Sequence, residues 1–415
     1  MTKYILFFFT FFMAVTMTHA KTKTLTTDGA WCWFQDPRAV YLNNQLFAGW
    51  MTHDGKLIIG SYDPKSGDKK TFVLEEDWDV DDHNTLSILT LPNNHLMVFY
   101  ARHNKVGLYC RTTQNPADIT KWQDEVTVSD TDRITYSHPA YLADEALYFV
   151  VWRGPTWKPT FATSKDGIHW SESHILVQEE GREASNIRPY LKAVSDNKST
   201  VHFAFNDGHP RNEPTNSVYY IKYEKGKFYR ADGTQIGTIE NLPIAHSKSD
   251  VVYDAKPTQK RAWIWDIALN KNGSPVLVYT SIPTVTEHHY HYAIHTPQGW
   301  QTHHITPGGK WFPQTPNGEQ ERETEYSGGI SLNHADPSTV YLSRPINDIF
   351  EIERWQTSDG GTTWTSQAIT KNATQLNVRP VIPRNYPANK IGVLWMSGTY
   401  IHYTDYHTEI HMILE

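Results

Sequence analysis

The sequence of 415 residues is 39% hydrophobic and 13% aromatic, and only 20% of its residues are charged. A chain of this composition is too apolar to be disordered and long enough to bury a large core. Its 38 Lys and Arg residues against 45 Asp and Glu residues give a formal net charge of −7, which excludes a general nucleic-acid-binding protein. A polyanionic ligand would therefore need a local basic site.

The start of the chain has the pattern of a secretory signal peptide. Lys3 precedes an apolar run over residues 4–15, and Ala20 ends the segment. The run is too short to span a bilayer, and no later segment reaches the ~20 apolar residues that a spanning helix needs. We expect removal of residues 1–20, a secreted or periplasmic protein without membrane attachment, and a single domain over residues 21–415.

The mature chain would contain two cysteines, Cys32 and Cys110. In an oxidising compartment they could form a disulfide, and two buried free thiols are equally compatible with the sequence. A zinc site with four cysteine ligands is excluded.

After the signal, short β-branched and aromatic segments alternate with turns rich in Asn, Asp, Gly and Pro, which is typical of an all-β protein. Seven pairs of these segments flank a tight turn, and the turns centre near residues 44, 93, 144, 197, 271, 336 and 386. The spacing is about 50 residues and widens to roughly 65–75 around the fifth hairpin. A period that leaves room for four strands predicts a seven-bladed β-propeller.

Two turn motifs support the propeller. Thr357-Ser-Asp-Gly-Gly-Thr-Thr-Trp364 has the S/T-x-D-x-G-x-x-W pattern of an Asp box, and Ser164-Lys-Asp-Gly-Ile-His-Trp170 is one residue shorter. In such a turn the Asp accepts hydrogen bonds from backbone N–H groups, Gly adopts unusual dihedral angles and Trp packs between blades. The stretch 207–261, rich in Asn, Gly, Lys and Asp, is predicted to be a fourth blade with long surface loops.

Hairpin symmetry places four polar residues at the ends of two hairpins, away from the turns, because strand pairing is symmetric about a turn. In the second hairpin, His83 and His103 are equally far from the turn centre at Asn93. In the third hairpin, Tyr136 and Arg153 are equally far from the turn centre. We therefore expect both pairs at the same rim of adjacent blades, and at one mouth of the central channel if these strands are innermost. A β-bulge in either hairpin would change this pairing.

Two imidazoles, a phenol and a guanidinium suit the removal of the C5 proton of a uronic acid. A guanidinium neutralises the sugar carboxylate by a forked contact. A base takes the proton and an acid protonates the departing O4, and His and Tyr with shifted pKa values can fill both roles. A chain with 21 His and 23 Tyr also forms such pairs by chance, so a structural Tyr–His contact is the alternative.

Eight segments of the sequence together resemble the BNR-repeat seven-bladed propellers. The segments are Trp31-Cys-Trp-Phe-Gln-Asp-Pro-Arg-Ala39, Asp82-His-Asn84, Ala101-Arg-His-Asn104, Thr135-Tyr-Ser-His-Pro139, Trp152-Arg-Gly154, Ile187-Arg-Pro-Tyr190, Tyr326-Ser-Gly-Gly329 and Asp336-Pro with Tyr341-Leu-Ser-Arg344. The resemblance covers nearly the whole mature chain. This group includes the ulvan lyases of polysaccharide lyase families 24 and 25. The same scaffold carries glycoside hydrolase family 145, which removes rhamnose from glucuronic acid with a catalytic His on the opposite face.

The resemblance to ulvan lyases implies β-elimination at the linkage between rhamnose sulfate and a uronate, carried out by two His, a Tyr and an Arg. By motif these residues are His83, His103, Tyr136 and Arg153, which we call the quartet. The resemblance implies that Arg153 binds the uronate carboxylate and that His103 binds or assists. It implies that Tyr136 and His83 share the base and acid steps, in an order that stays open.

Other residues are candidates for binding or for the hydrolase reaction. Arg188, Arg344 and Arg379 each precede a Pro at a strand start or end, and they are expected to bind sulfate at the rim. Solvated charges or ion pairs between blades are the alternative for each of them. His53, in the turn that follows the first hairpin, is the residue to examine for a hydrolase, and we expect that turn on the face opposite the quartet. A solvent-exposed turn residue is its alternative.

Four further histidines raise the question of a metal site: His288, His289, His291 and His295. The odd-numbered members would share one face of a strand, and two His at i and i+2 can ligate zinc. An exposed His-rich strand without a metal is the interpretation that the sequence favours. Elimination by the quartet requires no cofactor, while the resemblance to metal-stabilised ulvan lyases leaves a structural zinc or calcium ion open.

Three functions remain open from the sequence. The first is a secreted lyase that cuts ulvan, a sulfated rhamnose–uronate polysaccharide, and leaves 4,5-unsaturated uronyl ends. The second is a hydrolase that removes rhamnose from glucuronic acid, and the third is a non-catalytic glycan-binding propeller. The expected partner is an acidic sulfated polysaccharide, with no nucleic acid and no membrane, and the protein is expected to be a monomer.

Overall fold

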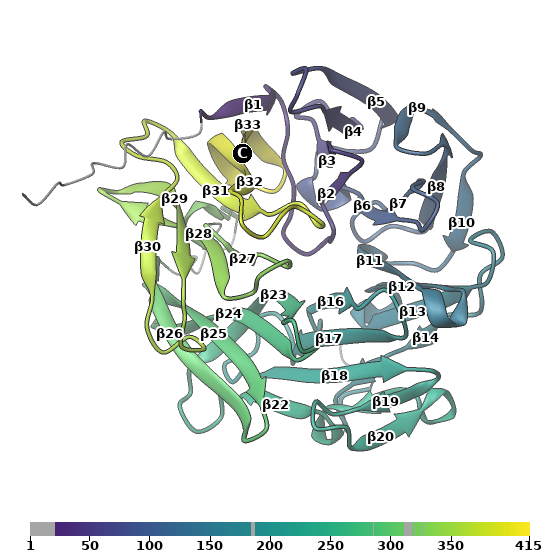
Figure 1. Ribbon diagram of the computed structural model, residues 1–415. Coiled ribbons are helices and arrows are strands. Elements are labelled where there is room, and N and C mark those ends of the chain that lie inside the picture. Colours follow the sequence, from purple (N-terminus) through teal and green to yellow (C-terminus); the bar gives the residue numbers. More distant parts are fainter. Residues whose placement is uncertain (1–20, 184–186, 285, 311–317, 320, 327) are drawn as a thin grey trace, which may run out of the picture.

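The computed structural model describes residues 21–183, 187–284, 286–310, 318–319, 321–326 and 328–415, so the predicted signal peptide lies outside the described residues. Antiparallel sheets follow one another around a ring, and the colours in Figure 1 pass once around it. The described residues form seven blades and no α-helix, which confirms the predicted seven-bladed β-propeller. Among these residues, no helix is long and apolar enough to cross a membrane.

The first three blades follow one another along the chain. Blade 1 contains β2 (Ala39–Leu42), β3 (Gln45–Met51), β4 (Leu57–Tyr62) and β5 (Lys69–Glu75). Blade 2 contains β6 (Ser87–Thr90), β7 (Leu96–Tyr100), β8 (Leu108–Asn115), β9 (Asp118–Trp122) and β10 (Val126–Ser129). Blade 3 contains β11 (Thr135–Leu142), β12 (Leu147–Arg153), β13 (Pro159–Ser164) and β14 (His174–Ile175).

Blade 4 contains β16 (Leu191–Ser195), β17 (Thr200–Asn206), β18 (Val218–Glu224), β19 (Lys227–Tyr229), β20 (Gln235–Thr238) and β22 (Asp250–Tyr253). Blade 5 contains β23 (Arg261–Leu269), β24 (Pro275–Thr284), β25 (Glu287–Thr296) and β26 (Gly299–Gly309). Blade 6 contains β27 (Ile330–Leu332), β28 (Thr339–Ile346), β29 (Ile349–Gln356) and β30 (Thr365–Ala368). The fourth blade is the longest, as the sequence predicts for residues 207–261.

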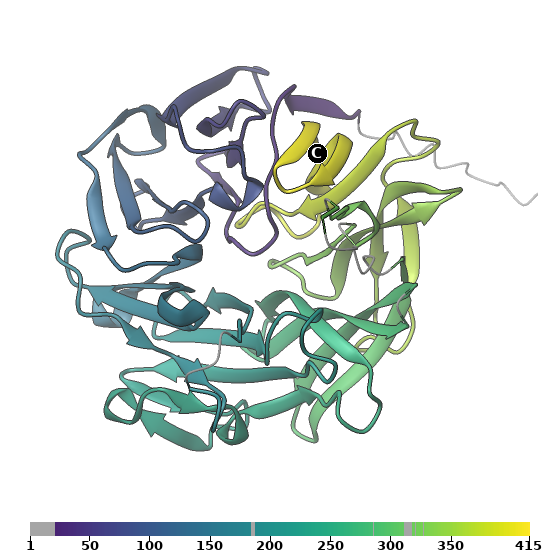
Figure 2. The same cartoon turned by 180° about the vertical axis from the view of Figure 1, so that it is seen from behind.

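Blade 7 closes the ring with strands from both ends of the described chain. It contains β31 (Leu376–Val381), β32 (Gly392–His402), β33 (Asp405–Leu414) and the N-terminal β1 (Lys23–Thr26). β1 pairs antiparallel with β33, and Figure 2 shows the two lying side by side from behind. The pairing covers the edge that an open blade would expose.

The remaining elements are short. β15 (Val177–Gln178) and β21 (Ile244–Ala245) pair in parallel beside blade 4. The 3-10 helices are η1 (Asp82–Asn84), η2 (Ala143–Glu145), η3 (Pro155–Trp157), η4 (Ile239–Asn241), η5 (His246–Lys248) and η6 (Thr324–Tyr326).

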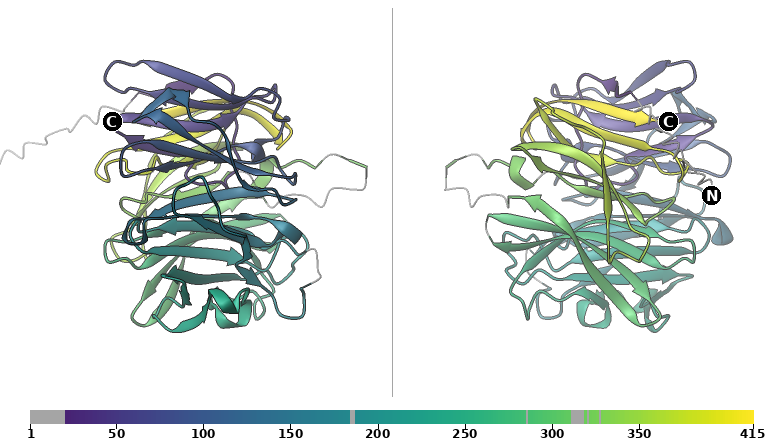
Figure 3. Two further views of the ribbon diagram at one scale, coloured as in Figure 1. Left: turned by 90° about the vertical axis from the view of Figure 1, so that its right-hand side faces the viewer. Right: turned by 60° about the vertical axis from the view of Figure 1, so that its left-hand side comes forward.

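Strands of all blades run across the thickness of the disc, which Figure 3 shows edge-on. The innermost strands are β2, β6, β11, β16, β23, β27 and β31, and each is joined to the next strand of its blade by one of the predicted hairpin turns. These turns therefore lie on one face, which we call the turn face. The opposite face, where the innermost strands begin, is the quartet face.

Packing between blades explains why the strands are apolar on both sides. Every residue of β4 and β7 is buried, because a strand between two neighbouring blades is covered on both faces. The Asp boxes act as expected: Thr363 N donates to Asp359 Oδ1 at 2.9 Å, and the Trp364 ring meets Tyr292 of the preceding blade at 5.3 Å. The motif thus fixes a turn and fills an inter-blade gap.

The chain between β1 and β2 runs into the centre of the ring. In Figure 1 this segment dips from the rim to the centre of the ring. Cys32, Trp33 and Phe34 line a pocket on the quartet face, whereas Asp36 and Pro37 line a pocket on the turn face. The segment that carries the first BNR-like motif is therefore a plug with a different pocket on each side. Cys32 and Cys110 are both buried free thiols, so the two do not form a disulfide.

Candidate active site

The structure places the four quartet residues in one pocket of about 230 Å³ on the quartet face. His83 lies in η1, just before β6, and His103 lies in the loop after β7. Tyr136 is the second residue of β11, and Arg153 is the last residue of β12. β6 and β11 are innermost strands of adjacent blades, so the four side chains meet at one mouth of the channel.

The two imidazoles are stacked in parallel and share one carboxylate. Their ring centroids lie 4.2 Å apart at an interplanar angle of 6°. Asp81 Oδ1 lies 2.8 Å from His83 Nδ1, and Asp81 Oδ2 lies 2.8 Å from His103 Nδ1. With both Nδ1 atoms bound to Asp81, the Nε2 atom of each ring is not engaged by a hydrogen bond from any described residue. The carboxylate therefore orients both rings and leaves both Nε2 atoms for a ligand.

A β-bulge displaces Tyr136 from the position that hairpin symmetry predicts. The register of β11 and β12 shifts between Thr135 and His138, so Thr135 rather than Tyr136 is opposite Arg153. Tyr136 sits in the bulge at a φ of 64°. The expected backbone pairing is therefore wrong, but the side chains still meet, because the Arg153 guanidinium lies 4.5 Å from the centre of the Tyr136 ring.

Hydrogen bonds fix the buried Arg153. Its Nη2 donates to Asn104 Oδ1 at 2.9 Å and to Thr135 Oγ1 at 3.2 Å. Trp157 Nε1 donates to the same Asn104 oxygen at 3.1 Å. No carboxylate pairs with Arg153 within the described residues, so its charge is available to an anionic ligand.

Burial and neighbouring charges separate the proton affinities of the quartet. Burial works against a charged His83, and its pKa rises well above its usual value where the neighbouring Tyr136, Cys32 and Asp81 carry negative charge. Burial and the adjacent His83 lower the pKa of His103 to about 4. Burial raises the pKa of Tyr136 well above its usual value. At neutral pH the Tyr136 phenol is thus protonated and His103 is a neutral imidazole.

Other pocket residues escaped the sequence analysis. Asp81 is two positions before His83, and Asp82, directly before it, offers a second carboxylate at 3.0 Å from His83 Nδ1. Asn104 follows His103 directly and orients Arg153. Tyr403, from the loop between β32 and β33, stands edge-on to the His83 ring at 4.6 Å. No local sequence signal predicts this contact, since it joins the second blade to the seventh.

The structure places the three predicted sulfate-binding arginines differently. Arg188 lines the pocket, and its guanidinium lies 4.7 Å from the centre of the Trp157 ring. Arg344 lies outside the pocket and donates to Glu353 of the same blade at 2.7 and 3.2 Å. Arg379 is 1% exposed and donates to Tyr400 and Asp82 beneath the pocket. The prediction that all three arginines bind sulfate at the rim is thus wrong for Arg344 and Arg379. The Arg344 guanidinium is already paired with Glu353, and the Arg379 side chain is not reached by solvent.

Arg379→Ala should lower the free energy of unfolding by about 3–5 kcal/mol, because it leaves the fully buried Asp82 without its main cation. Urea denaturation followed by tryptophan fluorescence measures the loss. Arg344→Ala is the matched control, and it should cost less than about 1 kcal/mol, because its pair with Glu353 is partly exposed. An Arg379→Ala protein as stable as this control would contradict the buried ion pair.

Two groups of side chains that could hold a metal ion include residues of the pocket: Cys32 with Asp82 and His83, and Asp81 with His83 and His103. The predicted His-rich strand forms no such group among the described residues. His288 is buried against Lys310 O at 2.8 Å, so it is not exposed as the sequence suggested. His289 Nδ1 contacts His304 Nε2 at 2.9 Å, and His291 contacts Ser281 Oγ at 2.7 Å.

His53 lies on the quartet face rather than on the expected opposite face. β3 runs from its hairpin turn toward the quartet face, so the loop between β3 and β4 returns there. His53 is exposed, and its Nδ1 lies 2.7 Å from Asp28 Oδ2. The pocket on the quartet face does not include it.

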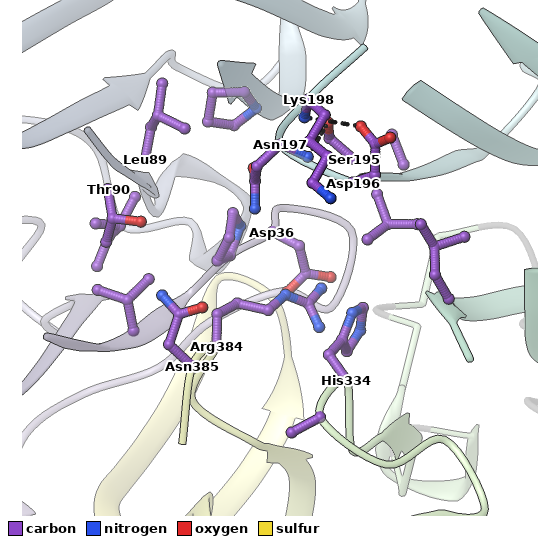
Figure 4. A pocket seen from close by; sticks show the side chains of 18 of the residues that line it. Asp36, Leu89, Thr90, Ser195, Asp196, Asn197, Lys198, His334, Arg384 and Asn385 are labelled. Carbon is purple, nitrogen blue, oxygen red and sulfur yellow. Dashed lines mark hydrogen bonds between the residues drawn. The ribbon is translucent and has the colours of Figure 1, made fainter. Parts of the chain in front are cut away.

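A second pocket of about 530 Å³ opens on the turn face (Figure 4). Arg384, His334 and Asp36 lie near one another at its centre. His334 Nε2 lies 3.1 Å from Asp266 Oδ1, and Asp36 is bound by the buried Lys192 and Arg38. These charges are largely paired with one another and hold the plug to blades 4 and 5.

The protein is thus a β-propeller with a polar pocket at one end of its central channel. Propellers of this kind present functional side chains there. The sequence matches the BNR repeat-containing family over residues 45–307, and the chain belongs to that family.

Solved structures of polysaccharide lyases are similar in fold. A PL25 ulvan lyase bound to -[GlcA(1-4)Rha3S]- has a TM-score of 0.71 and 13% identity, with 95% of this chain and 96% of that chain covered. The polysaccharide lyase Uly1 has a TM-score of 0.59 and 11% identity, with 92% and 90% covered. At these identities the similarity establishes the fold alone. The comparison with curated proteins found no match.

Proposed function

We propose that the protein is a polysaccharide lyase that cleaves a sulfated, uronate-containing polysaccharide of the ulvan type by β-elimination. The observation that carries this proposal is the meeting of a carboxylate-free Arg153, a phenol and two oriented imidazoles in one pocket. The similarity in fold to a PL25 ulvan lyase bound to a glucuronate–rhamnose sulfate glycan supports the choice of substrate.

Arg153 is the residue that we assign to the uronate carboxylate. Carboxylate binding by a guanidinium withdraws charge from C5 and stabilises the anion that forms when the C5 proton leaves. Asn104 and Thr135 fix the guanidinium before the substrate arrives, so little of this stabilisation is lost to reorganisation.

The imidazole pair and Tyr136 exchange the protons. His103 has the lower pKa and is the neutral member of the pair, so its Nε2 accepts the C5 proton. The C5–H electron pair forms the C4–C5 double bond, the C4–O4 bond breaks, and the protonated Tyr136 donates its proton to O4. His83 shares Asp81 with His103 and stacks on its ring, so it holds the base in position.

Arg188 is the cation that we assign to a sulfate group of the substrate. It lines the pocket beside Arg153 and packs on Trp157, whose indole Nε1 is bound to Asn104. Stacking on an aromatic ring holds a guanidinium in place while leaving its N–H groups free to fork onto an anion.

Incubation with ulvan tests the function. A lyase shortens the polymer and creates 4,5-unsaturated uronyl ends with new ultraviolet absorption. A hydrolase releases sugar without that absorption, and a binding protein gives neither product. We expect the first result, and either of the others would overturn the proposal.

The Asp81→Asn variant should lose at least about 100-fold in kcat, because both imidazoles lose the group that orients them. The Asp81 charge and hydrogen bond also raise the pKa of His103, so at an unchanged charge of His83 the substitution lowers that pKa. In the wild type, kcat/KM should fall on the acid side as His103 becomes protonated near pH 4. The acid limb should move to lower pH in the variant, and a limb that moves to higher pH would contradict the role of Asp81.

A hydrolase remains the second candidate, favoured by one observation. The turn-face pocket contains His334, whose Nε2 lies 3.1 Å from Asp266 Oδ1, an arrangement that can serve acid–base chemistry. His334→Ala separates the candidates: it should leave the unsaturated product of ulvan unchanged if the quartet pocket is the active site.

We infer a secreted or periplasmic monomer with one catalytic domain over residues 21–415. The pattern of residues 1–20 supports export, and the closure of the ring by β1 and β33 supports a single unit. N-terminal sequencing of the exported protein should begin at Lys21, and light scattering should give the mass of one chain; an uncleaved N-terminus or a dimer mass would contradict these points.

A further inference from the structure

Outside both pockets, one side chain of blade 4 and two from the short sheet beside it converge. Glu179 follows β15, His246 follows β21, and Asp207 follows β17. Their ligand atoms all lie within 4.8 Å of one another. His246 Nδ1 is 3.5 Å from Asp207 Oδ1, which is longer than a hydrogen bond between these groups.

Backbone pairing brings two of these residues together. β15 and β21 are parallel, with Val177 opposite Ile244 and Gln178 opposite Ala245. Glu179 and His246 are the next residues in that register, so they stand side by side where both strands end. Asp207 is fixed separately, because its Oδ2 accepts from Ser217 N at 2.7 Å.

The state of His246 points to a missing partner. Its side chain is 4% exposed, and its ring lies between Phe205 at 5.1 Å and Tyr219 at 5.2 Å. Both ring nitrogens are buried without a hydrogen-bond partner, which holds for no other histidine of the described chain. Buried polar groups in native proteins are almost always bonded, because an unmade bond is costly.

We propose that Glu179, Asp207 and His246 bind a zinc ion. An imidazole and two carboxylates are a zinc donor set, whereas calcium and magnesium take oxygen ligands. Three protein ligands leave a fourth tetrahedral position for water. The proposal is independent of the lyase proposal, since none of these residues lines the quartet pocket.

The position of the ion suggests what it would stabilise. Asp207 begins the loop 207–217, which carries His209 and Arg211 to the wall of the quartet pocket. Arg182 joins the two sides, because its Nη1 donates to Glu179 at 2.9 Å and to Glu213 of the same loop at 3.1 Å. A zinc ion would therefore tie the foot of this loop to β15 and β21.

Zinc content tests the proposal. Purified protein is stripped with a chelator, loaded with zinc chloride, freed of excess metal and measured by mass spectrometry. His246→Phe keeps an aromatic ring between Phe205 and Tyr219 and removes both nitrogens. We expect this variant and Glu179→Gln each to bind one zinc ion fewer than the wild type, and to lose the rise in Tm that zinc gives the wild type.

A control variant is needed to separate zinc at this site from zinc at other histidines. His289→Ala removes the contact with His304 on blade 5, and this variant should keep the zinc-dependent rise in Tm. Anomalous diffraction at the zinc edge should show a peak among Glu179, Asp207 and His246. Equal zinc content in the wild type and both site variants, or a peak only at Asp81, His83 and His103, would overturn the proposal. Should His246→Phe fail to fold, Glu179→Gln still decides the result.

Discussion

Arg153→Ala should reduce kcat/KM for elimination by about 10²–10³-fold or more, since a positioned donor to a developing anion is worth this much. The side chain is 4% exposed and has no carboxylate partner in the described residues, so the substrate carboxylate is the anion that its charge can meet. Without it, the C5 proton must leave from beside an unneutralised carboxylate. Initial rates of ultraviolet absorbance with ulvan measure the effect.

Two further arginine variants sharpen this prediction. Arg344→Ala is the matched control, because Arg344 pairs with Glu353 outside the pocket, and it should keep wild-type kcat/KM. Arg153→Lys keeps the charge but not the fork, so we expect activity between that of the wild type and that of Arg153→Ala. Wild-type activity in Arg153→Ala would refute the assignment of the carboxylate.

Tyr136→Phe should reduce kcat by about 10²–10⁴-fold, the range for the loss of a general acid. Phe keeps the ring that contacts Phe34, His83 and the Arg153 guanidinium, so the pocket should keep its shape and KM should change little. The loss should be smaller with a substrate whose leaving group needs no proton, such as a good aryl leaving group at O4.

Tyr148→Phe provides the control for the phenol. Tyr148 lies on β12, the strand that ends at Arg153, but outside the quartet pocket. This variant should match the wild type in kcat and in circular dichroism. If Tyr136→Phe also matched the wild type, the phenol would not be the acid.

The hairpins were predictable because their signals are local. Turn residues such as Asn94 and Asn197 adopt a positive φ, and the pairing of β6 with β7 is symmetric about residue 93 as expected. Counting residues outward from this turn centre correctly predicts that His83 and His103 lie together. Both nevertheless lie beyond the last paired residues, His83 in η1 and His103 in a loop.

The bulge in β11 was not predictable from residue counting. It puts Tyr136 into a strained positive φ, which only the surrounding structure can impose. Arg379 has a φ of 53° at a similar irregularity in β31, and this conformation turns its side chain inward to Asp82. An arginine expected at the rim is buried for this reason.

Contacts between distant segments also could not be predicted from the sequence. Asp81 is close to His83 in the chain, but its bond to His103 joins residues 22 apart. Glu179 and His246 meet through a parallel pair of two-residue strands, and strands this short have no hydrophobic periodicity that would predict them. Such contacts depend on how the loops pack once the blades have closed into a ring.

The location of the reaction is best tested by a crystal structure of the Tyr136→Phe variant with a sulfated uronate–rhamnose oligosaccharide. The account predicts a uronate carboxylate on the Arg153 guanidinium, with C5 facing the Nε2 atoms of the stacked imidazoles. A sugar bound instead beside His334 in the turn-face pocket, with the quartet pocket empty, would contradict it.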